Sequence, residues 1–251
     1  MDNTVLVGLS QQMAVSTSMD TVANNLANMS TPGFKRDMTM FQEYLEPVRP
    51  SESESTLHQL SLTWDAGTAR DLSAGHIEQT NAPYDLALNG SGYFVIQTAN
   101  GPRYTRDGHF TLDAQGRIVT ESGDPLQGEG GDVTVSPEDG PVTIAKDGTV
   151  TSINSSTGLT DQFGKIQVVQ FPDENQLVKE GTNLYSTTQT PTPAASATVL
   201  QGALESSNVE PVVEMSQMIE IMRAYQSMAT LMQSHEDLKR AAIDKLASTQ
   251  T

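Results

Sequence analysis

Cysteine is absent from this 251-residue chain, and basic residues are scarce. The missing cysteine excludes disulfides, thiolate metal sites and cysteine nucleophiles. Lys and Arg number 14 against 31 Asp and Glu, so the formal net charge is -17. Such a chain repels a polyphosphate backbone, which argues against a nucleic-acid partner.

Long apolar runs and aromatic side chains are also lacking. No stretch approaches the ~18 apolar residues of a membrane-spanning helix, so we expect no membrane insertion. The first twenty residues begin acidic and lack a long apolar core, so we expect no cleaved secretory signal. Aromatic residues make up only 5% of the chain, which predicts a modest hydrophobic core for this length.

Methionine and glycine divide the chain into ends and a middle. All eleven methionines lie outside residues 41–214, whereas 17 of the 19 glycines lie between Gly67 and Gly202. Methionine favours helices and glycine disfavours them, so the ends are expected to be helical. The glycine-rich middle is expected to form strands and tight turns, which gives an α+β fold class.

The two ends have helical periodicity, from Thr4 to Asn28 and from Pro211 to Leu246. One face of the first segment is apolar in steps of four and three: Val15, Met19, Val22, Leu26 and Met29. The second segment carries two adjacent stripes, one with Met218, Met222, Tyr225, Ala229 and Met232, the other with Ile221, Met228, Leu231 and Leu238. Periodicity leaves two interpretations open. The helices form either an ordinary hairpin packed on its own domain or a coiled coil that associates with other chains.

Between the helices, the composition changes twice. Residues 35–75 contain two prolines and an alternating Ser/Glu run at 51–55, and we expect an extended linker or hairpin there. Residues 76–207 consist of short β-prone runs separated by hairpin-type dipeptides such as Asn100-Gly101 and Asp107-Gly108. The expected regions are a terminal helical domain from 1–34 and 208–251, the 35–75 segment, and a β-rich middle domain over 76–207.

No residue pattern typical of catalysis or of metal or cofactor binding stands out. The four histidines, at 58, 76, 109 and 235, have no His or carboxylate partner at a zinc-ligand spacing. Residues 89–92 lack the GxSxG spacing of a nucleophile elbow. We therefore expect no enzyme activity, no metal and no cofactor. Four glycines of the middle are interpreted as turn residues: Gly90, Gly92, Gly108 and Gly116.

The end of the first helical segment carries the most informative motif, ANNLANMSTPGFKR at residues 23–36. Three asparagines fall within five positions: Asn24, Asn25 and Asn28. Asparagine is a poor helix former, but beside an apolar seam its amide can hydrogen-bond across helices and fix their register. The alternative is that these residues only fray and cap the helix end. A sharp turn is expected at Pro32, Gly33 and Phe34.

Residues 24–34 resemble the N-terminal signature of the bacterial flagellar rod, hook and hook-associated protein family. Three further motifs are similar to that family and follow in its order: Leu86 to Phe94; Tyr104 to Phe110 with Asp113 and Gly116; and Gly202 to Val209 with Val212, Glu214 and Met215. Together the four span essentially the whole chain. The length resembles a basal-body rod protein rather than the longer hook protein. The loop at 126–131 resembles the proximal rod type more than the distal one.

The resemblance implies a structural subunit of the proximal rod that is required for flagellum assembly and motility. Family members leave the cell through the flagellar type III export apparatus without signal cleavage and assemble in the periplasm as a helical tube. Their terminal helices pair as a coiled coil in the inner layer, and the β-domains lie outside. The implied partners are copies of the chain, other rod proteins and the export apparatus. The assembly interface is then expected to comprise Val15, Met19, Val22, Asn24, Asn25, Leu26, Asn28, Met29, Met218, Ile221, Met222, Tyr225, Met228 and Met232.

Three other interpretations remain. One is a distal rod or hook-type subunit. Another is a secreted β-domain that binds carbohydrate through Tyr93, Tyr104 or Trp64 and has dispensable end helices. The third is a cell-wall hydrolase, against which the missing metal and nucleophile signatures argue.

Overall fold

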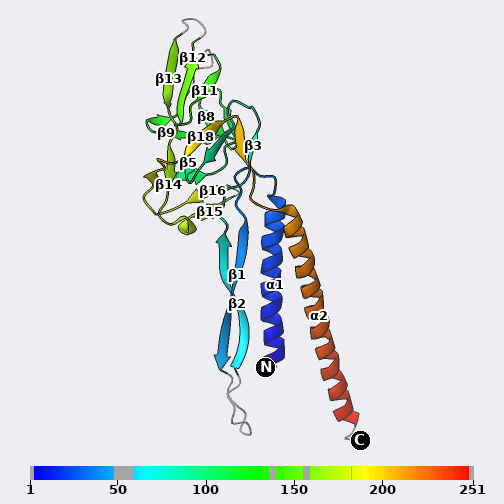
Figure 1. Ribbon diagram of the computed structural model, residues 1–251. Coiled ribbons are helices and arrows are strands. Elements are labelled where there is room, and N and C mark those ends of the chain that lie inside the picture. Colours follow the sequence, from blue (N-terminus) through cyan, green and yellow to red (C-terminus); the bar gives the residue numbers. More distant parts are fainter. Residues whose placement is uncertain (1–2, 48–58, 136–139, 155–158, 182, 249–251) are drawn as a thin grey trace. The chain divides into compact units, whose positions relative to one another are not determined.

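The computed structural model describes residues 3–47, 59–135, 140–154, 159–181 and 183–248 (Figure 1). The chain divides into two compact units. Unit 1 consists of Met1–Ala27, Asp37–Asp71 and Glu210–Thr251, and unit 2 of Asn28–Arg36 and Leu72–Val209. Most of the 35–75 segment, expected to be an extended linker or hairpin, is thus grouped with the terminal helices. The Ser/Glu run at 51–55 lies outside the described residues.

Unit 1 contains both terminal helices, and the expected helical ends are confirmed. Helix α1 covers Asn3–Ala27 and helix α2 covers Pro211–Ser248. The two lie side by side and run antiparallel, since Gly8 of α1 lies near Met232 of α2 while Asn25 hydrogen-bonds Glu214. Proline at the first position of α2 loses no helical hydrogen bond, which suits it to that place.

A long hairpin completes unit 1. Strand β1 (Asp37–Pro47) pairs antiparallel with β2 (Gln59–Arg70), and the register shifts between Met40 and Phe41. One face of the hairpin is turned to α1, because Thr39 Oγ1 lies 3.5 Å from Ser18 Oγ. Figure 1 shows α1 lying between this hairpin and α2.

Unit 2 is built from short antiparallel strands, as the glycine-rich middle predicts. Its largest sheet has six strands in the order β15 (Val178–Glu180), β16 (Leu184–Ser186), β6 (Gly101–Thr105), β5 (Tyr93–Thr98), β14 (Val168–Gln170) and β17 (Thr192–Pro193). A second sheet contains β11 (Val142–Ile144), β12 (Thr149–Ile153) and β13 (Thr160–Lys165).

Four strand pairs and one short helix complete the described part of unit 2. The pairs are β18 (Thr198–Gln201) with β4 (Leu86–Asn89), β19 (Ala203–Glu205) with β3 (Ile77–Gln79), β7 (Phe110–Leu112) with β8 (Ile118–Thr120), and β9 (Gln127–Gly128) with β10 (Gly131–Asp132). The 3-10 helix η1 covers Glu174–Gln176.

Strand β5 organises the core of unit 2 because it is buried on both faces. Phe94 and Ile96 point into one hydrophobic cluster, where Phe94 packs edge-on against Phe110 with ring centroids 5.4 Å apart. Tyr93 and Val95 point into a second cluster on the other face. Alternation along a strand explains why one short apolar run fills both clusters.

Candidate assembly surface

Asn25 joins three elements of unit 1 near the end of α1. Its side chain is 1% exposed. The amide nitrogen donates to the carbonyl of Asp37 at 2.8 Å, and the amide oxygen accepts from the Asp37 N–H at 3.0 Å. The side chain therefore pairs with β1 as a neighbouring strand would. The same nitrogen donates to Oε2 of the buried Glu214, in the first turn of α2, at 3.3 Å.

The two helices also meet near the start of α1, where small and flexible side chains allow a close approach. A methyl group built on Gly8 would lie 3.6 Å from Cγ and Sδ of Met232, which is ordinary van der Waals contact. One turn further along α1, Gln12 Nε2 donates to the Tyr225 hydroxyl at 3.0 Å. Together with Asn25, these contacts fix the antiparallel register of α1 and α2.

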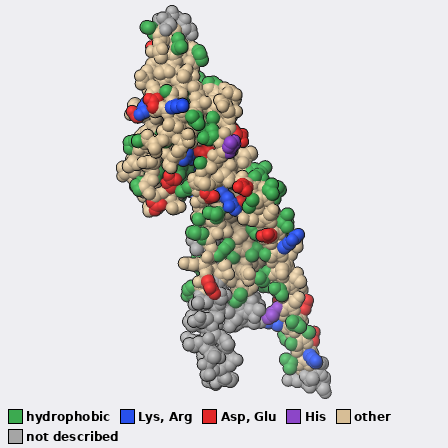
Figure 2. All heavy atoms as spheres, in the orientation of Figure 1, with side chains coloured by type: hydrophobic (Ala, Val, Ile, Leu, Met, Phe, Trp, Pro, Cys, Tyr) green, Lys and Arg blue, Asp and Glu red, His purple; other side chains and the backbone are tan. Residues whose placement is uncertain are grey.

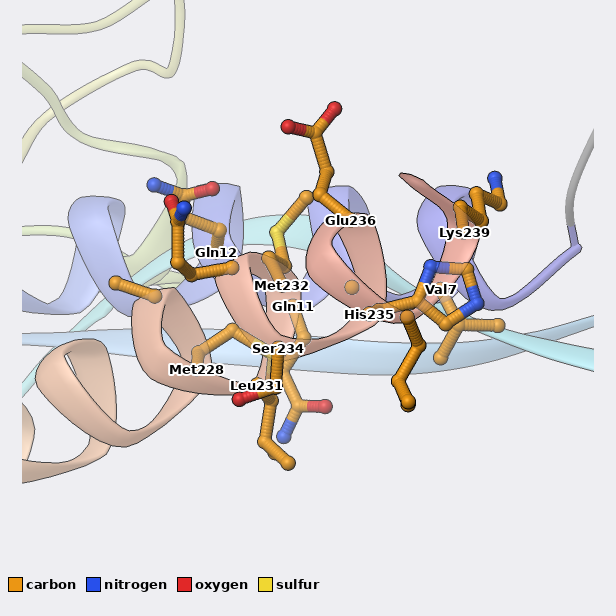
Figure 3. Close-up of a pocket in the computed structure, with 14 residues that line it drawn as sticks. Val7, Gln11, Gln12, Met228, Leu231, Met232, Ser234, His235, Glu236 and Lys239 are labelled. Atoms are coloured by element: carbon orange, nitrogen blue, oxygen red, sulfur yellow. The ribbon is translucent and has the colours of Figure 1, made fainter. Parts of the chain in front are cut away.

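An apolar groove opens beside this contact (Figure 3), with a volume of about 880 Å³. Helix α1 contributes Val7, Gly8, Gln11 and Gln12. The α2 side runs from Met228 to Lys239, and Figure 3 shows Met228, Leu231 and Met232 among its side chains. The groove thus exposes apolar atoms of both helices within unit 1.

The predicted interface residues of the first helix lie mostly in a partly covered seam. Val22 is buried, while Val15, Met19 and Leu26 are half-buried. Met29 lies past the end of α1, in unit 2, and is exposed. Asn24 is exposed on α1, and Asn28 lies beyond the helix end, where its Oδ1 accepts from Thr31 Oγ1 at 3.3 Å.

The predicted residues of the second helix differ in exposure. Four of them are half-buried: Met218, Ile221, Met228 and Met232. Met222 and Tyr225 are more exposed. Each stripe seen in the sequence contains both half-buried and exposed residues, so the structure separates the residues that pack near α1 from those that remain open.

Several of the most open apolar residues of α2 were not among the predicted interface residues. Leu231 and Leu238 are 62% and 70% exposed, and Ile243 and Leu246 near the end of α2 are similarly open. Figure 2 shows hydrophobic side chains interspersed with charged ones along this helix. The sequence shows that Leu231 and Leu238 share a face, but only the fold shows that α1 leaves it uncovered.

In unit 2, the motif after the first helix meets the motif before the second around a buried carboxylate, Glu205. Lys35 Nζ forms an ion pair with Glu205 Oε1, and Arg106 Nη1 approaches Oε2 at 3.3 Å. The Gly75 N–H also donates to Oε1, at 2.9 Å. Lys35 and Glu205 are each 1% exposed. Charges so far from water persist only when paired, so this cluster holds three distant segments together.

The turn before Lys35 is held in the same place. Gly33 N–H donates to the Glu205 carbonyl at 2.7 Å, and Gly33 has a φ of 68°, which few residues other than glycine adopt. A Cβ at this position would lie 2.5 Å from the backbone of Arg106. The carbonyl of Pro32 accepts from Asn183 Nδ2 at 2.9 Å. Phe34 is buried, and Lys179 Nζ lies 4.1 Å from its ring centroid.

The four glycines of the middle motifs lie at strand junctions. Gly90 and Gly92 are between β4 and β5, and Gly116 is between β7 and β8. Gly108 allows the closest approach, since a Cβ there would lie 1.6 Å from the carbonyl oxygen of Leu86. Within the described residues, no cluster of three or more His, Cys, Asp or Glu side chains could hold a metal ion. No described helix is both long and apolar enough to cross a bilayer.

Three family models match the chain, and together they cover both ends and the middle. The model described as "Flagella basal body rod protein" matches residues 6–35, and "Flagellar hook protein FlgE/F/G D1 domain" matches residues 87–152. The model "Flagellar basal body rod FlgEFG protein C-terminal" matches residues 200–245. The first and last matches contain the segments that meet at Glu205 and at Asn25.

Full-length relatives agree with these matches. The chain is 42% identical to the flagellar basal-body rod protein FlgF of Caulobacter vibrioides, over 98% of each chain. It is 30% identical to FlgF of Mesorhizobium japonicum over 99% of each, and 30% identical to the rod protein FlgG of Bacillus subtilis over 94% of this chain and 96% of that one. The chain therefore belongs to the flagellar basal-body rod protein family as an FlgF-like member, a structural subunit rather than an enzyme.

Proposed function

We propose that this chain polymerises through its terminal helices, as a subunit of the proximal part of the rod. The observation that carries the proposal is the uncovered apolar surface of α2, above all at Leu231 and Leu238. Both leucines also line the apolar groove of unit 1, and exposed apolar side chains gathered in one place mark an interaction site in soluble proteins. In a rod, these side chains would pack against neighbouring subunits.

The energetics favour this use of the helix. Burying one leucine side chain that is otherwise exposed stabilises an interface by roughly 1.5–3 kcal/mol. Leu231 and Leu238 lie seven residues apart and so share a face of α2, as do Met215 and Met222. Repeats of this spacing favour packing as a coiled coil, first between α1 and α2 and then with helices of other copies. The interface residues predicted above, joined by Leu231 and Leu238, are the proposed contact set.

Location and export follow from family membership as further parts of the proposal. The rod would assemble in the periplasm from chains exported by the flagellar type III apparatus without signal cleavage. Other rod proteins and further copies of this chain would be its neighbours. An open helical array requires head-to-tail contacts between different surfaces, which an asymmetric pair of terminal helices supplies.

Burial argues against the carbohydrate-binding alternative. Two of its three candidate aromatic residues, Tyr93 and Tyr104, lie in the core of unit 2. Burial and the neighbouring Glu174, whose Oε2 accepts from the Tyr93 hydroxyl at 3.0 Å, raise the pKa of Tyr93 far above its usual value. A ring fixed in this way cannot stack on a sugar at the surface.

The proposal is tested by adding charge to the open face of α2. The double variant Leu231→Asp, Leu238→Asp should remove the chain from isolated basal bodies and abolish swimming. Both side chains are exposed on α2, so the chain should stay folded, which circular dichroism of the purified chain checks. The matched control is Thr230→Asp, Ala241→Asp, two exposed positions on another face of α2 that receive the same charge. Normal swimming in the first variant, or equal loss in both, would contradict the proposal.

A further inference from the structure

The outer face of the β1–β2 hairpin is a second apolar surface, distinct from the helices. Residues at alternate positions of a strand share a face, so Met38, Met40 and Tyr44 lie together. Trp64 pairs directly with Gln42 across the hairpin and therefore joins the same face. We call the set Met38, Met40, Tyr44 and Trp64 the hairpin outer face.

This face points away from α1. Thr39, which belongs to the opposite face, is the residue that approaches Ser18 of α1. Tyr44 and Trp64 are 57% and 68% exposed, and Met38 and Met40 are also open. A sheet with one covered side normally places polar residues on the other, whereas here large apolar side chains lie on the open side, and Phe41, on the face of Thr39, is 41% exposed as well.

The described charged side chains of the hairpin lie on the face that α1 approaches. Among hairpin side chains that the structure describes, the charged ones are Asp37, Glu43 and Arg70. Asp37 and Glu43 alternate with the apolar residues of β1. Arg70 lies opposite Asp37 across the hairpin, and its Nε is 3.2 Å from the Asp37 Oδ1. All three therefore share the face of Thr39. Among the side chains that the structure describes, the hairpin outer face carries no charge, so an acidic partner such as this chain, with a net charge of -17, meets no described like charge there.

A matching surface exists on the same unit. Met215, Met222 and Ala229 lie seven residues apart on α2 and are all exposed. We call these three residues the α2 flank. Its ends are 14 residues apart, which is ~21 Å along a helix. On the hairpin outer face, Met38 and Tyr44 are six residues apart, which is ~20 Å along a strand.

We infer that the hairpin outer face of one copy packs on the α2 flank of a second copy of this chain. Within one copy α1 lies between the hairpin and α2, so the two surfaces serve different neighbours (Figure 1). Both surfaces combine methionine with neutral neighbours, and flexible thioethers pack well against the aromatic rings of Tyr44 and Trp64. The inference rests on the proposed function and adds to it a head-to-tail contact, which propagates instead of closing into a dimer.

Cross-linking tests this contact cleanly because the natural chain has no cysteine. Cells would produce two differently tagged copies, one with Trp64→Cys and the other with Met222→Cys. Isolated basal bodies would then be treated with a short bismaleimide. We expect a dimer that carries both tags. The matched control replaces Trp64→Cys with Thr68→Cys, which is exposed on the opposite hairpin face, and the mixed dimer should decrease several-fold.

Two results would overturn the inference. One is a basal body that contains both cysteine copies but yields no mixed dimer. The other is cross-linking of the Trp64→Cys copy to a different rod protein instead. Either result leaves the proposed function standing, because incorporation itself is then observed.

If the cysteine copies do not enter basal bodies, opposite charges introduced on the two surfaces test the contact instead. Trp64→Lys alone and Met222→Glu alone should each reduce incorporation, and the double variant should restore it. Restoration supports the contact, whereas a double variant no better than the single ones overturns it. The Leu231→Asp, Leu238→Asp variant reports on the proposed function separately, since it leaves both of these surfaces unchanged.

Discussion

Replacing Glu205 with alanine is the most informative perturbation of the β-rich unit. The side chain forms an ion pair with Lys35 and another with Arg106, and both cations are almost fully buried. Without the carboxylate, Lys35 Nζ keeps its hydrogen bond to the Ser73 carbonyl at 2.7 Å, and Arg106 Nη2 keeps the Gly90 carbonyl at 2.9 Å. Their charges, however, lose the anion that compensates them.

The expected cost follows from this loss. Removing one partner of a buried ion pair typically destabilises a protein by about 3–5 kcal/mol, because a buried charge remains uncompensated. The Gly75 N–H also loses its acceptor. We expect Glu205→Ala to lower the free energy of unfolding of unit 2 by about 4 kcal/mol, which is a large part of the ~5–15 kcal/mol that stabilises a typical domain.

Urea unfolding of the full chain measures this effect, with hydrogen exchange of the β5 amides to locate it in unit 2. Glu180→Ala is the matched control, because Arg103 Nε lies 2.6 Å from Glu180 Oε2 in a pair whose carboxylate is 43% exposed. Exposed pairs contribute about 0–1 kcal/mol, so the control should change little. A second variant, Lys35→Met in the Glu205→Ala background, should recover part of the loss. A Glu205→Ala cost no larger than that of the control would refute the reasoning.

Three further predictions concern single residues. Gly8→Ala should raise the free energy of unfolding of unit 1 by about 0.5–1 kcal/mol in urea titrations, because alanine favours helix and its methyl group fits beside Met232; a loss of stability would contradict this packing. Asn25→Ala should lower the free energy of unfolding of unit 1 by about 2–3 kcal/mol, because the Asp37 peptide and the buried Glu214 lose a hydrogen-bond partner. An unchanged urea midpoint would count against this prediction. Burial raises the pKa of Tyr93 in the folded chain, so above about pH 10 only the unfolded state loses that proton and stability should fall. Tyr93→Phe should make this fall shallower in thermal unfolding followed between pH 9 and 11, and an identical pH profile would exclude the effect.

Local chemistry determines the parts of the fold that were predictable. Apolar residues in steps of three and four define the two terminal helices, and Pro32 with Gly33 ends the first of them near Ala27. Hairpin dipeptides and β-prone runs define the strands of the middle. These signals act between residues close in the chain, so they are readable without knowledge of the fold.

The role of individual side chains depends on contacts between distant segments. Glu205 and Lys35 are 170 positions apart, and nothing in either local sequence predicts that they are buried together. Likewise, the asparagine motif indicates a register-fixing amide, but only the fold shows that Asn25 pairs with the peptide of Asp37.

Composition and periodicity in the sequence determined the helices and the strands, because hydrogen bonding and packing within a helical turn or a hairpin are short-range, and the four motifs indicated the family. The tertiary structure alone decided which apolar residues remain open. Leu231, Leu238 and Trp64 are as hydrophobic as the core residues, and they differ from them only because α1 does not cover them. Burial depends on which surfaces meet after the chain has folded, so no local pattern in the sequence specifies it.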